Sequence, residues 1–289
     1  MSTTTPPLTA HFATLAPRYD VLLCDVWGVV HNGVAATAES CAALIKFRNQ
    51  GGTVVLITNA PRPGDFVQSF IDTLKVPRDA YDAIVSSGDV TRSLVAERAG
   101  ERVFHVGPER DLPIFEGLDV EIAPIERADF AVCSGLYDDT RETPQDYVKL
   151  IDEMYARKLA MICANPDVVV ERGDHLVYCA GAIADLYAHA GGDVIYAGKP
   201  YRPIYEQAIA CAQALLGRAV DHGRVMAIGD SVRTDLKGAA AFNIDSLFVT
   251  AGIHAQELGG RDEPDPAALR DILAAAGVAP TAVMRRLEW

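Results

Sequence analysis

The sequence predicts an α/β protein built around a doubly wound parallel sheet. Short apolar runs rich in β-branched residues recur along the chain, as expected for strands that are buried on both faces. Helical patterns lie between these runs, and alternation of strand and helix is typical of a parallel sheet covered on both sides. The clearest predicted strands cover residues 21–25, 53–58, 83–87, 194–198, 224–230 and 246–250.

The first helix is predicted over residues 38–52, between the first two strands. Ala42, Ile45 and Arg48 recur at helical spacing and define one face of it. Gly51 and Gly52 close the segment, and glycine is a common stop at the C-terminus of a helix. We therefore expect an amphipathic helix that packs on the sheet.

The middle of the chain predicts a second, smaller α/β domain inserted into the first. We expect the inserted domain to cover residues 102–190, so that the main domain comprises residues 1–101 and 191–289. The segment TAVMRRLEW (281–289) is predicted to pack on the main domain, with an oligomer contact as the alternative. A helix is expected near residues 143–157, and further strands at 102–106, 119–123, 129–135 and 159–167.

The composition limits the classes of partner. The chain has 289 residues, of which 49% are hydrophobic and 22% charged, as in a folded protein with a substantial core. Its formal net charge of −13 disfavours nucleic acid or an anionic membrane as the main partner. A small anionic substrate stays compatible with this charge, because it responds to the local field of a cleft.

Targeting signals and cysteine usage predict a cytoplasmic protein. The segment MSTTTPPLTA has neither the basic start nor the apolar stretch of a secretory signal. No window approaches the roughly 18 apolar residues that a membrane helix needs. The cysteines form no C-x-x-C pair, so buried free thiols in a reducing compartment are expected rather than a zinc ribbon or disulfides. They are Cys24, Cys41, Cys133, Cys163, Cys179 and Cys211.

Polar residues follow several of the predicted strands. In open α/β sheets, ligands bind beyond the carboxyl ends of the strands, so these residues are expected to converge on one rim. The set combines carboxylates, two hydroxyls, an amide and a lysine. Its members are Asp25, Thr58, Asn59, Lys199, Asp230, Ser231 and Asp235.

This set is suited to phosphate chemistry. Lys199 and a divalent ion could neutralise a phosphoryl group as it is attacked. Asp25 and Asp230 offer the hard oxygen ligands that Mg²⁺ prefers. Thr58 and the backbone N–H groups after it could form a phosphate cradle, and an aspartate can attack phosphorus directly. Each of these residues alone is commonly a turn, a helix cap or a solvated side chain, so the prediction depends on their joint occurrence.

Other phosphate motifs do not fit. A P-loop requires G-x-x-x-x-G-K-[ST], but Asp193 stands at the first glycine position before Gly198-Lys199, and Pro200 follows the lysine. No G-x-G-x-x-G motif lies at a predicted strand–helix junction, so a dinucleotide-binding fold is not supported either.

Four segments of the chain resemble the haloacid dehalogenase (HAD) superfamily, both in their residues and in their order along the chain. The resemblance is strongest to its class IIA members, relatives of the NagD-like sugar phosphatases and of the phosphoglycolate and pyridoxal phosphatases. It implies a Rossmann-like core with an inserted C2-type cap, Mg²⁺ as cofactor, a small phosphorylated metabolite as substrate and a homodimer formed through the cap. CANPD (163–167) and GAI (181–183) resemble parts of that cap. The four segments are LLCDVWGVVHNG, VVLITNAPRP, YAGKPYRPIY and VMAIGDSVRTDLKGAAAFNI.

The resemblance also implies a role for each site residue. Asp25 would be the nucleophile and a Mg²⁺ ligand, and Asp230 a second ligand. Thr58 and Asn59 would bind phosphate, while Lys199 would neutralise it and orient Asp25. Ser231 and Asp235 would support the metal ligands from behind. Substrate choice would fall to cap residues near 137–139 and 165–167, although Asp138 and Asp139 fit ordinary turn residues equally well.

Trp27 departs from the pattern of the family phosphatases, which carry a second aspartate two residues after the nucleophile. That aspartate protonates the leaving alcohol and then activates water, and an indole can do neither. The family also binds the metal through the backbone carbonyl at this position, which Trp27 retains. His31 is the nearest titratable substitute for the missing acid/base, with a loop or core histidine as the alternative interpretation.

Three functions stay open at this point. The first is a phosphatase in which another group transfers the proton, or whose substrate has an acidic leaving group. The second is attack on carbon, as in the haloacid dehalogenases, which carry an aromatic residue here and need no metal. The third is a non-catalytic protein that binds a phosphorylated metabolite. The retained set of Asp25, Lys199 and Asp230 favours the first, and the intact acidic segment 229–235 argues against the second.

Overall fold

The computed structural model describes residues 8–172, 175–260 and 263–289, and the chain falls into two units that are described in turn. The first unit comprises Met1–Thr58, Gln68–Val85 and Tyr205–Trp289. The second unit comprises Asn59–Val67 and Ser86–Ile204. It contains all of residues 102–190 together with the segments on either side. The predicted domain assignment, with its narrower inserted domain, stays a prediction.

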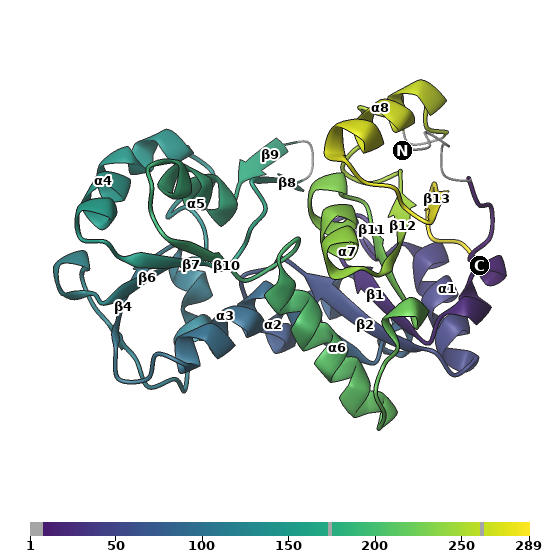
Figure 1. Ribbon diagram of the computed structural model, residues 1–289, viewed down its shortest axis with the longest axis horizontal. Coiled ribbons are helices and arrows are strands. Elements are labelled where there is room, and N and C mark those ends of the chain that lie inside the picture. Colours follow the sequence, from purple (N-terminus) through teal and green to yellow (C-terminus); the bar gives the residue numbers. More distant parts are fainter. Residues whose placement is uncertain (1–7, 173–174, 261–262) are drawn as a thin grey trace. The chain divides into compact units, whose positions relative to one another are not determined.

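The first unit is built on a six-stranded sheet with the order β13-β12-β11-β1-β2-β3 (Figure 1). Neighbouring strands from β13 to β2 pair in parallel. Every residue of β1, β2 and β11 is buried, as the uninterrupted apolar runs predict. The strands are β1 (Val21–Asp25), β2 (Thr53–Thr58), β3 (Ala83–Ser86), β11 (Val225–Gly229), β12 (Asp245–Val249) and β13 (Ala282–Met284).

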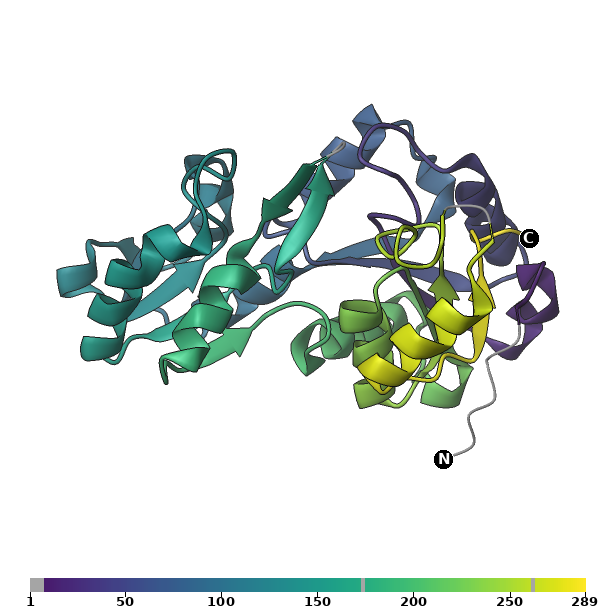
Figure 2. The same ribbon diagram turned by 90° about the horizontal axis from the view of Figure 1, so that it is seen from above.

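Helices lie on both faces of this sheet. α1 (Ala38–Asn49) covers one face, whereas α7 (Lys237–Phe242) and α8 (Pro266–Ala276) cover the other (Figure 2). This division follows from right-handed crossovers, because the chain adds strands in one direction from β1 and in the opposite direction from β11. The doubly wound fold class is confirmed. Two further helices, α2 (Gly64–Thr73) and α6 (Arg202–Leu216), begin in the second unit and end in the first.

The buried face of α1 differs from the predicted one. Cys41, Leu44 and Phe47 are buried, whereas Ala42 is exposed, so the prediction placed the face one residue too far along the chain. Two apolar stripes run side by side on this helix, and spacing alone cannot choose between them. The predicted glycine stop is confirmed, because the helix ends at Asn49 and Gly51 adopts a φ of 90°.

The second unit has its own five-stranded parallel sheet, with the order β10-β7-β6-β4-β5. An antiparallel hairpin of β8 and β9 was not predicted from the sequence. The strands are β4 (Arg102–Val106), β5 (Glu121–Ile122), β6 (Phe130–Cys133), β7 (Ala160–Cys163), β8 (Val169–Arg172), β9 (His175–Tyr178) and β10 (Val194–Tyr196). The helices are α3 (Ser87–Ala96), α4 (Val148–Ala156) and α5 (Ala180–His189). Across the described chain, the 3₁₀ segments are Phe12–Thr14, Ala16–Arg18, Arg78–Ala80, Glu109–Phe115, Ile125–Arg127, Pro144–Tyr147 and His222–Arg224.

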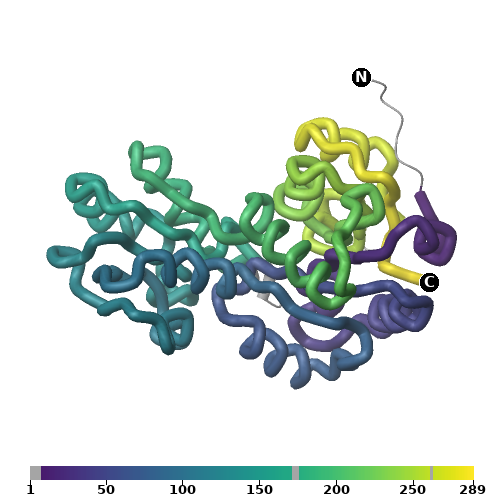
Figure 3. Tube along the Cα trace, turned by 60° about the horizontal axis from the view of Figure 1, so that its bottom comes forward, coloured from purple at the N-terminus to yellow at the C-terminus, as the bar shows by residue number. Residues whose placement is uncertain are grey.

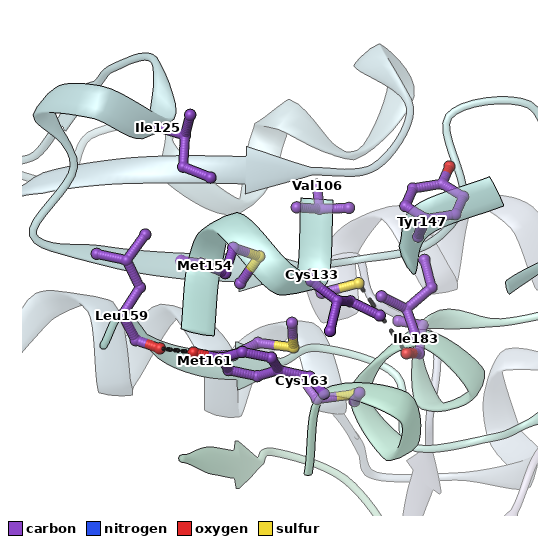
Figure 4. Close-up of a cluster of buried hydrophobic side chains, with 14 of the residues drawn as sticks. Val106, Ile125, Cys133, Tyr147, Met154, Leu159, Met161, Cys163 and Ile183 are labelled. Atoms are coloured by element: carbon purple, nitrogen blue, oxygen red, sulfur yellow. Dashed lines mark hydrogen bonds between the residues drawn. The ribbon is translucent and has the colours of Figure 1, made fainter. Parts of the chain in front are cut away.

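Successive side chains of β6 and β7 enter two different cores, because side chains of a strand alternate between its faces. Ala131 and Cys133 pack with Met154 of α4 and Ile183 of α5 in one core (Figure 4). In the other core, Phe130 and the side chains of β6 and β7 on the same face of the sheet pack with α3 and the 3₁₀ segment Glu109–Phe115. The second unit is therefore a sheet covered on both faces.

One predicted strand belongs to a different sheet from the one expected. The run at 194–198 was expected among the strands of the sheet that carries Asp25, but β10 pairs with β7 in the second unit. Hydrogen bonds between strands join residues far apart in sequence, so an apolar run does not reveal which sheet it joins.

The C-terminal segment packs on the first unit, as predicted. β13 pairs with β12, and Leu287 is fully buried. The chain near Phe12 runs beside this segment, where its N–H donates to the carbonyl oxygen of Glu288 over 2.7 Å (Figure 3). The rings of Phe12 and Trp289 lie 6.1 Å apart, edge to face. Within the described ranges, none of the helices combines the length and apolar character that crossing a bilayer would require.

Candidate active site

Asp25 is the last residue of β1, the strand that lies between β11 and β2. The register pairs Asp25 with Ile57 on one side and Cys24 with Ile228 on the other. The residues that follow β2 and β11 therefore leave the sheet at the same edge as Asp25. Thr58 is the last residue of β2, and Asp230 directly follows β11.

Three carboxylates meet at this edge. One oxygen from each of Asp25, Asp230 and Asp235 lies within 4.8 Å of the other two, and all three residues are buried. Carboxylates this close repel one another strongly, and a cation among them would offset that repulsion. Buried carboxylate oxygens are also the ligands that Mg²⁺ prefers, so the residues present fit a divalent metal.

The carboxylate of Asp230 is held between two glycines. A Cβ added at Gly28 would lie 1.9 Å from Asp230 Oδ2, and one at Gly252 would lie 2.0 Å from the same atom. The N–H of Ile253 donates to Asp230 Oδ2 over 2.8 Å. The loop after β12 thus helps to place Asp230. Sequence reasoning missed Gly252 and Ile253, although the end of the predicted strand 246–250 signalled a rim loop there.

We expect Gly28→Ala to weaken divalent metal binding by about tenfold or more, in line with changes to the groups that orient metal ligands. Gly28 adopts a φ of 85°, so alanine adds backbone strain as well as a clash with Asp230. Titration calorimetry with Mg²⁺ measures the affinity. Gly51→Ala is the matched control, because Gly51 has a φ of 90° but no atom within 4 Å of an added Cβ. Equal Mg²⁺ affinity in the two variants would contradict the prediction.

Ser231 and Asp235 organise the turn after β11. Ser231 caps the π-helical turn Val232–Leu236, since its Oγ accepts the N–H of Thr234 over 3.3 Å. Asp235 Oδ2 accepts the N–H of Ser231 over 3.2 Å. The side chains of both residues thus hold the backbone that carries Asp230, and one oxygen of Asp235 also reaches the carboxylate cluster.

Trp27 lies in a tight turn that is built around its indole. The ring packs on Gly33, where an added Cβ would approach Trp27 Cζ2 to 2.7 Å. The His31 ring lies edge-on at 5.0 Å from the indole, and the two residues form an isolated parallel bridge. The ring of Phe70 also lies edge-on to the His31 ring, with centroids 5.7 Å apart. Trp27 is therefore a fixed part of the turn.

His31 is held as a neutral imidazole. It is 2% exposed, and burial lowers its pKa to about 4. Its Nδ1 accepts the N–H of Gly33 over 2.9 Å, which leaves the ring proton on Nε2. A base with so low a pKa is a poor match for proton transfer near neutral pH. The geometry favours the core-histidine interpretation, in which His31 supports Trp27.

We expect the free energy of unfolding to fall as the pH drops from about 6.5 to about 4, partly because of His31. In that pH range the unfolded chain binds a proton at this histidine and the folded chain does not. Protonation therefore lowers the free energy of the unfolded state relative to the folded state. The contribution reaches about 3 kcal/mol, since one unit of pKa corresponds to about 1.4 kcal/mol. Urea unfolding of His31→Asn should show a weaker pH dependence, while the exposed control His222→Asn should keep it. An unchanged slope in His31→Asn would refute the assignment.

Asn59 and Lys199 belong to the second unit. The chain passes from Thr58 of the first unit into Asn59, and Lys199 follows β10. The side chain of Asn59 bonds both backbone groups of Lys199, accepting its N–H over 2.7 Å and donating to its carbonyl over 3.1 Å. The role of Lys199 beside Asp25 stays a prediction.

The predicted specificity residues of the second unit have local partners. Asp138 accepts the N–H and hydroxyl of Thr140, over 3.0 and 2.6 Å, and this lowers its pKa. Asp139 pairs with Arg110 over 2.6 Å. For Asp138, these contacts favour the turn interpretation that the sequence left open.

A fold of this kind, with an aspartate at the end of a central strand and a second acidic loop at the same edge, defines the class of HAD-like hydrolases. The chain matches the haloacid dehalogenase-like hydrolase family over residues 22–121 and a HAD-hydrolase-like family over residues 196–283. A crystal structure of a haloacid dehalogenase-like hydrolase from Brucella suis 1330 is 46% identical, with a TM-score of 0.86, and the match covers 97% of this chain and all of that one. The chain belongs to the haloacid dehalogenase-like hydrolase family.

Two relatives carry more specific names. D-glycerol 3-phosphate phosphatase from Mycobacterium tuberculosis is 27% identical over 248 residues, which cover 84% of this chain but only 66% of that protein. A crystal structure of glycerol phosphate phosphatase from the same organism, in complex with calcium, is 22% identical with a TM-score of 0.68. That match covers 94% of this chain and 72% of that one and shows a common fold.

Proposed function

We propose that this protein is a Mg²⁺-dependent phosphatase that hydrolyses a small phosphomonoester through an aspartyl-phosphate on Asp25. The observation that carries the proposal is the cluster of Asp25, Asp230 and Asp235, whose buried carboxylate oxygens lie within 4.8 Å of one another. A nucleophilic carboxylate next to a cation site is what attack on a dianionic phosphate requires.

The reaction divides into two displacements. In the first, a carboxylate oxygen of Asp25 attacks phosphorus, the bond from phosphorus to the leaving oxygen breaks, and the alcohol leaves. In the second, water attacks phosphorus and releases inorganic phosphate and the free Asp25 carboxylate. Overall, one phosphomonoester and one water give one alcohol and one phosphate. Each step is easier than direct attack by water.

Asp25 and Asp230, with the backbone carbonyl of Trp27, would hold the metal. The ion supplies neutralisation of the phosphate charge as that charge shifts during transfer. Asp235 and Ser231 keep the Asp230 loop in place. Thr58, at the end of β2, would bind the phosphate together with the backbone that follows it, and Lys199 would neutralise its remaining charge.

Trp27 restricts the leaving group. With no carboxylate two residues after Asp25, the departing oxygen receives its proton from solvent or leaves as a stable anion. Positioned acid–base catalysis is worth about 10²–10⁴-fold, so substrates with acidic leaving groups gain over simple alkyl phosphates. The site thus favours phosphate esters of acidic hydroxyl groups.

Phosphate release from a panel of phosphomonoesters, with and without Mg²⁺, tests the proposal. The panel includes both enantiomers of glycerol 3-phosphate, because a relative bears the name of that activity, and an aryl phosphate with an acidic leaving group. Release that requires Mg²⁺ supports the proposal. Chloride release from 2-chloroacids without phosphate release would replace it with attack on carbon. Binding of a phosphorylated metabolite without turnover of any compound would indicate a binding protein.

The proposal places the enzyme in a reducing cytoplasm, as a homodimer. The six cysteines carry reduced thiols, and five of them are buried, which fits a compartment without disulfide formation. Size-exclusion chromatography with light scattering measures the assembly state.

A further inference from the structure

Both N–H donors of the Asn59 side-chain amide are already hydrogen-bonded. Its Nδ2 donates to Asp167 Oδ1 over 2.9 Å and to the carbonyl of Lys199 over 3.1 Å. Its Oδ1 accepts the N–H of Lys199 over 2.7 Å. A primary amide has two N–H donors, so both are used. A phosphate needs donors, which means that this side chain is a poor partner for a substrate phosphate.

The close approach of Asn59 depends on the glycine before Lys199. A Cβ added at Gly198 would lie 2.4 Å from Asn59 Oδ1 and 2.8 Å from Pro166 Cδ. Any other residue at this position would push the Lys199 segment away from the amide. The GKP segment that resembles the family is therefore shaped by contact with Asn59 and Pro166.

Asp167 is held in place from the other side. Its N–H donates to Asn165 Oδ1 over 3.0 Å, and its carbonyl accepts the N–H of Gly181 at the start of α5 over 3.1 Å. A Cβ at Gly181 would approach the carbonyl oxygen of Pro166 to 2.3 Å. The segments NPD and GAI thus form one support that orients the carboxylate of Asp167 toward Asn59.

We propose that Asn59 is a positioning residue for Lys199 and that Asp167 fixes the orientation of the Asn59 amide. The backbone of Lys199 is bonded on both its N–H and its carbonyl by one side chain, so the starting point of the lysine side chain is set. The functional part of this inference rests on the proposed function, in which Lys199 neutralises phosphate. Asp167 then acts through Asn59 and not as a contact to the substrate.

The test uses variants that change donors and acceptors separately. Asn59→Ala removes both. Asn59→Asp keeps the acceptor for the Lys199 N–H but loses the donors and sets two carboxylates against each other. Adding Asp167→Asn to Asn59→Asp restores a donor between the two positions in the reverse direction. Asp152→Asn, on the exposed face of α4, is the control for an Asp-to-Asn change.

Hydrogen exchange at the backbone amide of Lys199 tests the structural part of the proposal, that Asn59 holds the backbone of Lys199. We expect exchange to be about 10²-fold faster in Asn59→Ala, since breaking a hydrogen bond that holds the segment lowers the cost of local opening. Asn59→Asp should show exchange between that of the wild type and that of Asn59→Ala, because its carboxylate still accepts this N–H but no longer donates to the carbonyl of Lys199. Unchanged exchange in Asn59→Ala overturns the proposal, whatever the enzyme activity.

Phosphate release reads the functional part. We expect Asn59→Asp to lower kcat/KM by about 10²-fold, the cost typical of a misplaced catalytic group. The added Asp167→Asn should recover at least about tenfold of that loss, and Asn59→Asp should have no further effect in a Lys199→Ala background. An equal loss with and without Lys199 overturns the positioning role while leaving the proposed function intact. If the wild type releases no phosphate, the proposed function fails, and the exchange of the Lys199 amide alone decides whether Asn59 holds Lys199.

Discussion

Asp25→Asn is expected to abolish phosphate release, with a loss of at least about 10⁴-fold in kcat, as is typical when a covalent nucleophile is removed. An asparagine amide keeps the shape of the side chain, but its nitrogen and its neutral oxygen do not attack phosphorus. The carboxylate lies within 4.8 Å of those of Asp230 and Asp235, so removing its charge also relieves repulsion. We therefore expect the melting temperature without divalent ions to stay the same or to rise. Loss of activity with no loss of stability is the signature of a functional group.

Asp20→Asn is the matched control for this experiment. Asp20 directly precedes β1, at the end of the strand opposite Asp25, and pairs with Arg218 and Arg224 over 2.8 and 2.6 Å. These ion pairs lower the pKa of Asp20 to about 2. The variant should retain phosphate release and lose some stability, the reverse of Asp25→Asn. If Asp25→Asn kept more than a small fraction of wild-type release, Asp25 would not be the nucleophile.

Trp27→Asp is expected to raise phosphate release from alkyl phosphates by about 10²–10⁴-fold, the usual value of a positioned general acid. The reason is local: position 27 stands two residues beyond Asp25, where the family phosphatases carry their acid. Aryl phosphates with acidic leaving groups should gain far less, because their leaving oxygen needs no proton. Rates for a series of esters that differ only in leaving-group acidity measure the effect. The slope against leaving-group pKa should be steep in the wild type and shallow in the variant.

Trp27→Asn separates the two consequences of this change. Both variants lose the packing of the indole on Gly33 and His31, but only aspartate gains a titratable group. We expect Trp27→Asn to be no faster than the wild type on any ester. If both variants were equally fast, the gain would come from opening the turn and not from acid catalysis. If neither gained, the turn around Trp27 would be incompatible with the usual acid.

The wild-type slope has a direct bearing on function. A steep dependence on the leaving group would mean that the enzyme is suited to phosphate esters whose alcohol is itself acidic. The turn from Trp27 to Gly33 packs around this indole. His31 lies within the turn, is buried, contacts the indole and accepts the N–H of Gly33. Trp27 is therefore a packed, structural part of this turn.

Local patterns in the sequence predicted most of the individual elements. The strands 21–25 and 53–58 have the expected bounds because each is an apolar run that ends in a polar residue. The strand 102–106 also has the expected bounds, and Gly107 follows it. The polar residues at the ends of β1 and β2 and directly after β11 were located for the same reason. The wrong face of α1 and the unpredicted hairpin of β8 and β9 arise where two apolar stripes compete or where the run is short.

The sequence by itself determined the fold class, the family resemblance and the candidate residues, because these depend on order and spacing along the chain. Only the tertiary structure decided that the strand before Lys199 joins a second sheet, that His31 supports Trp27, and that the Asn59 amide is occupied by Lys199 and Asp167. These facts depend on hydrogen bonds between residues far apart in sequence, or on how deeply a side chain is buried in the folded protein. Neither can be deduced from the periodicity of the sequence.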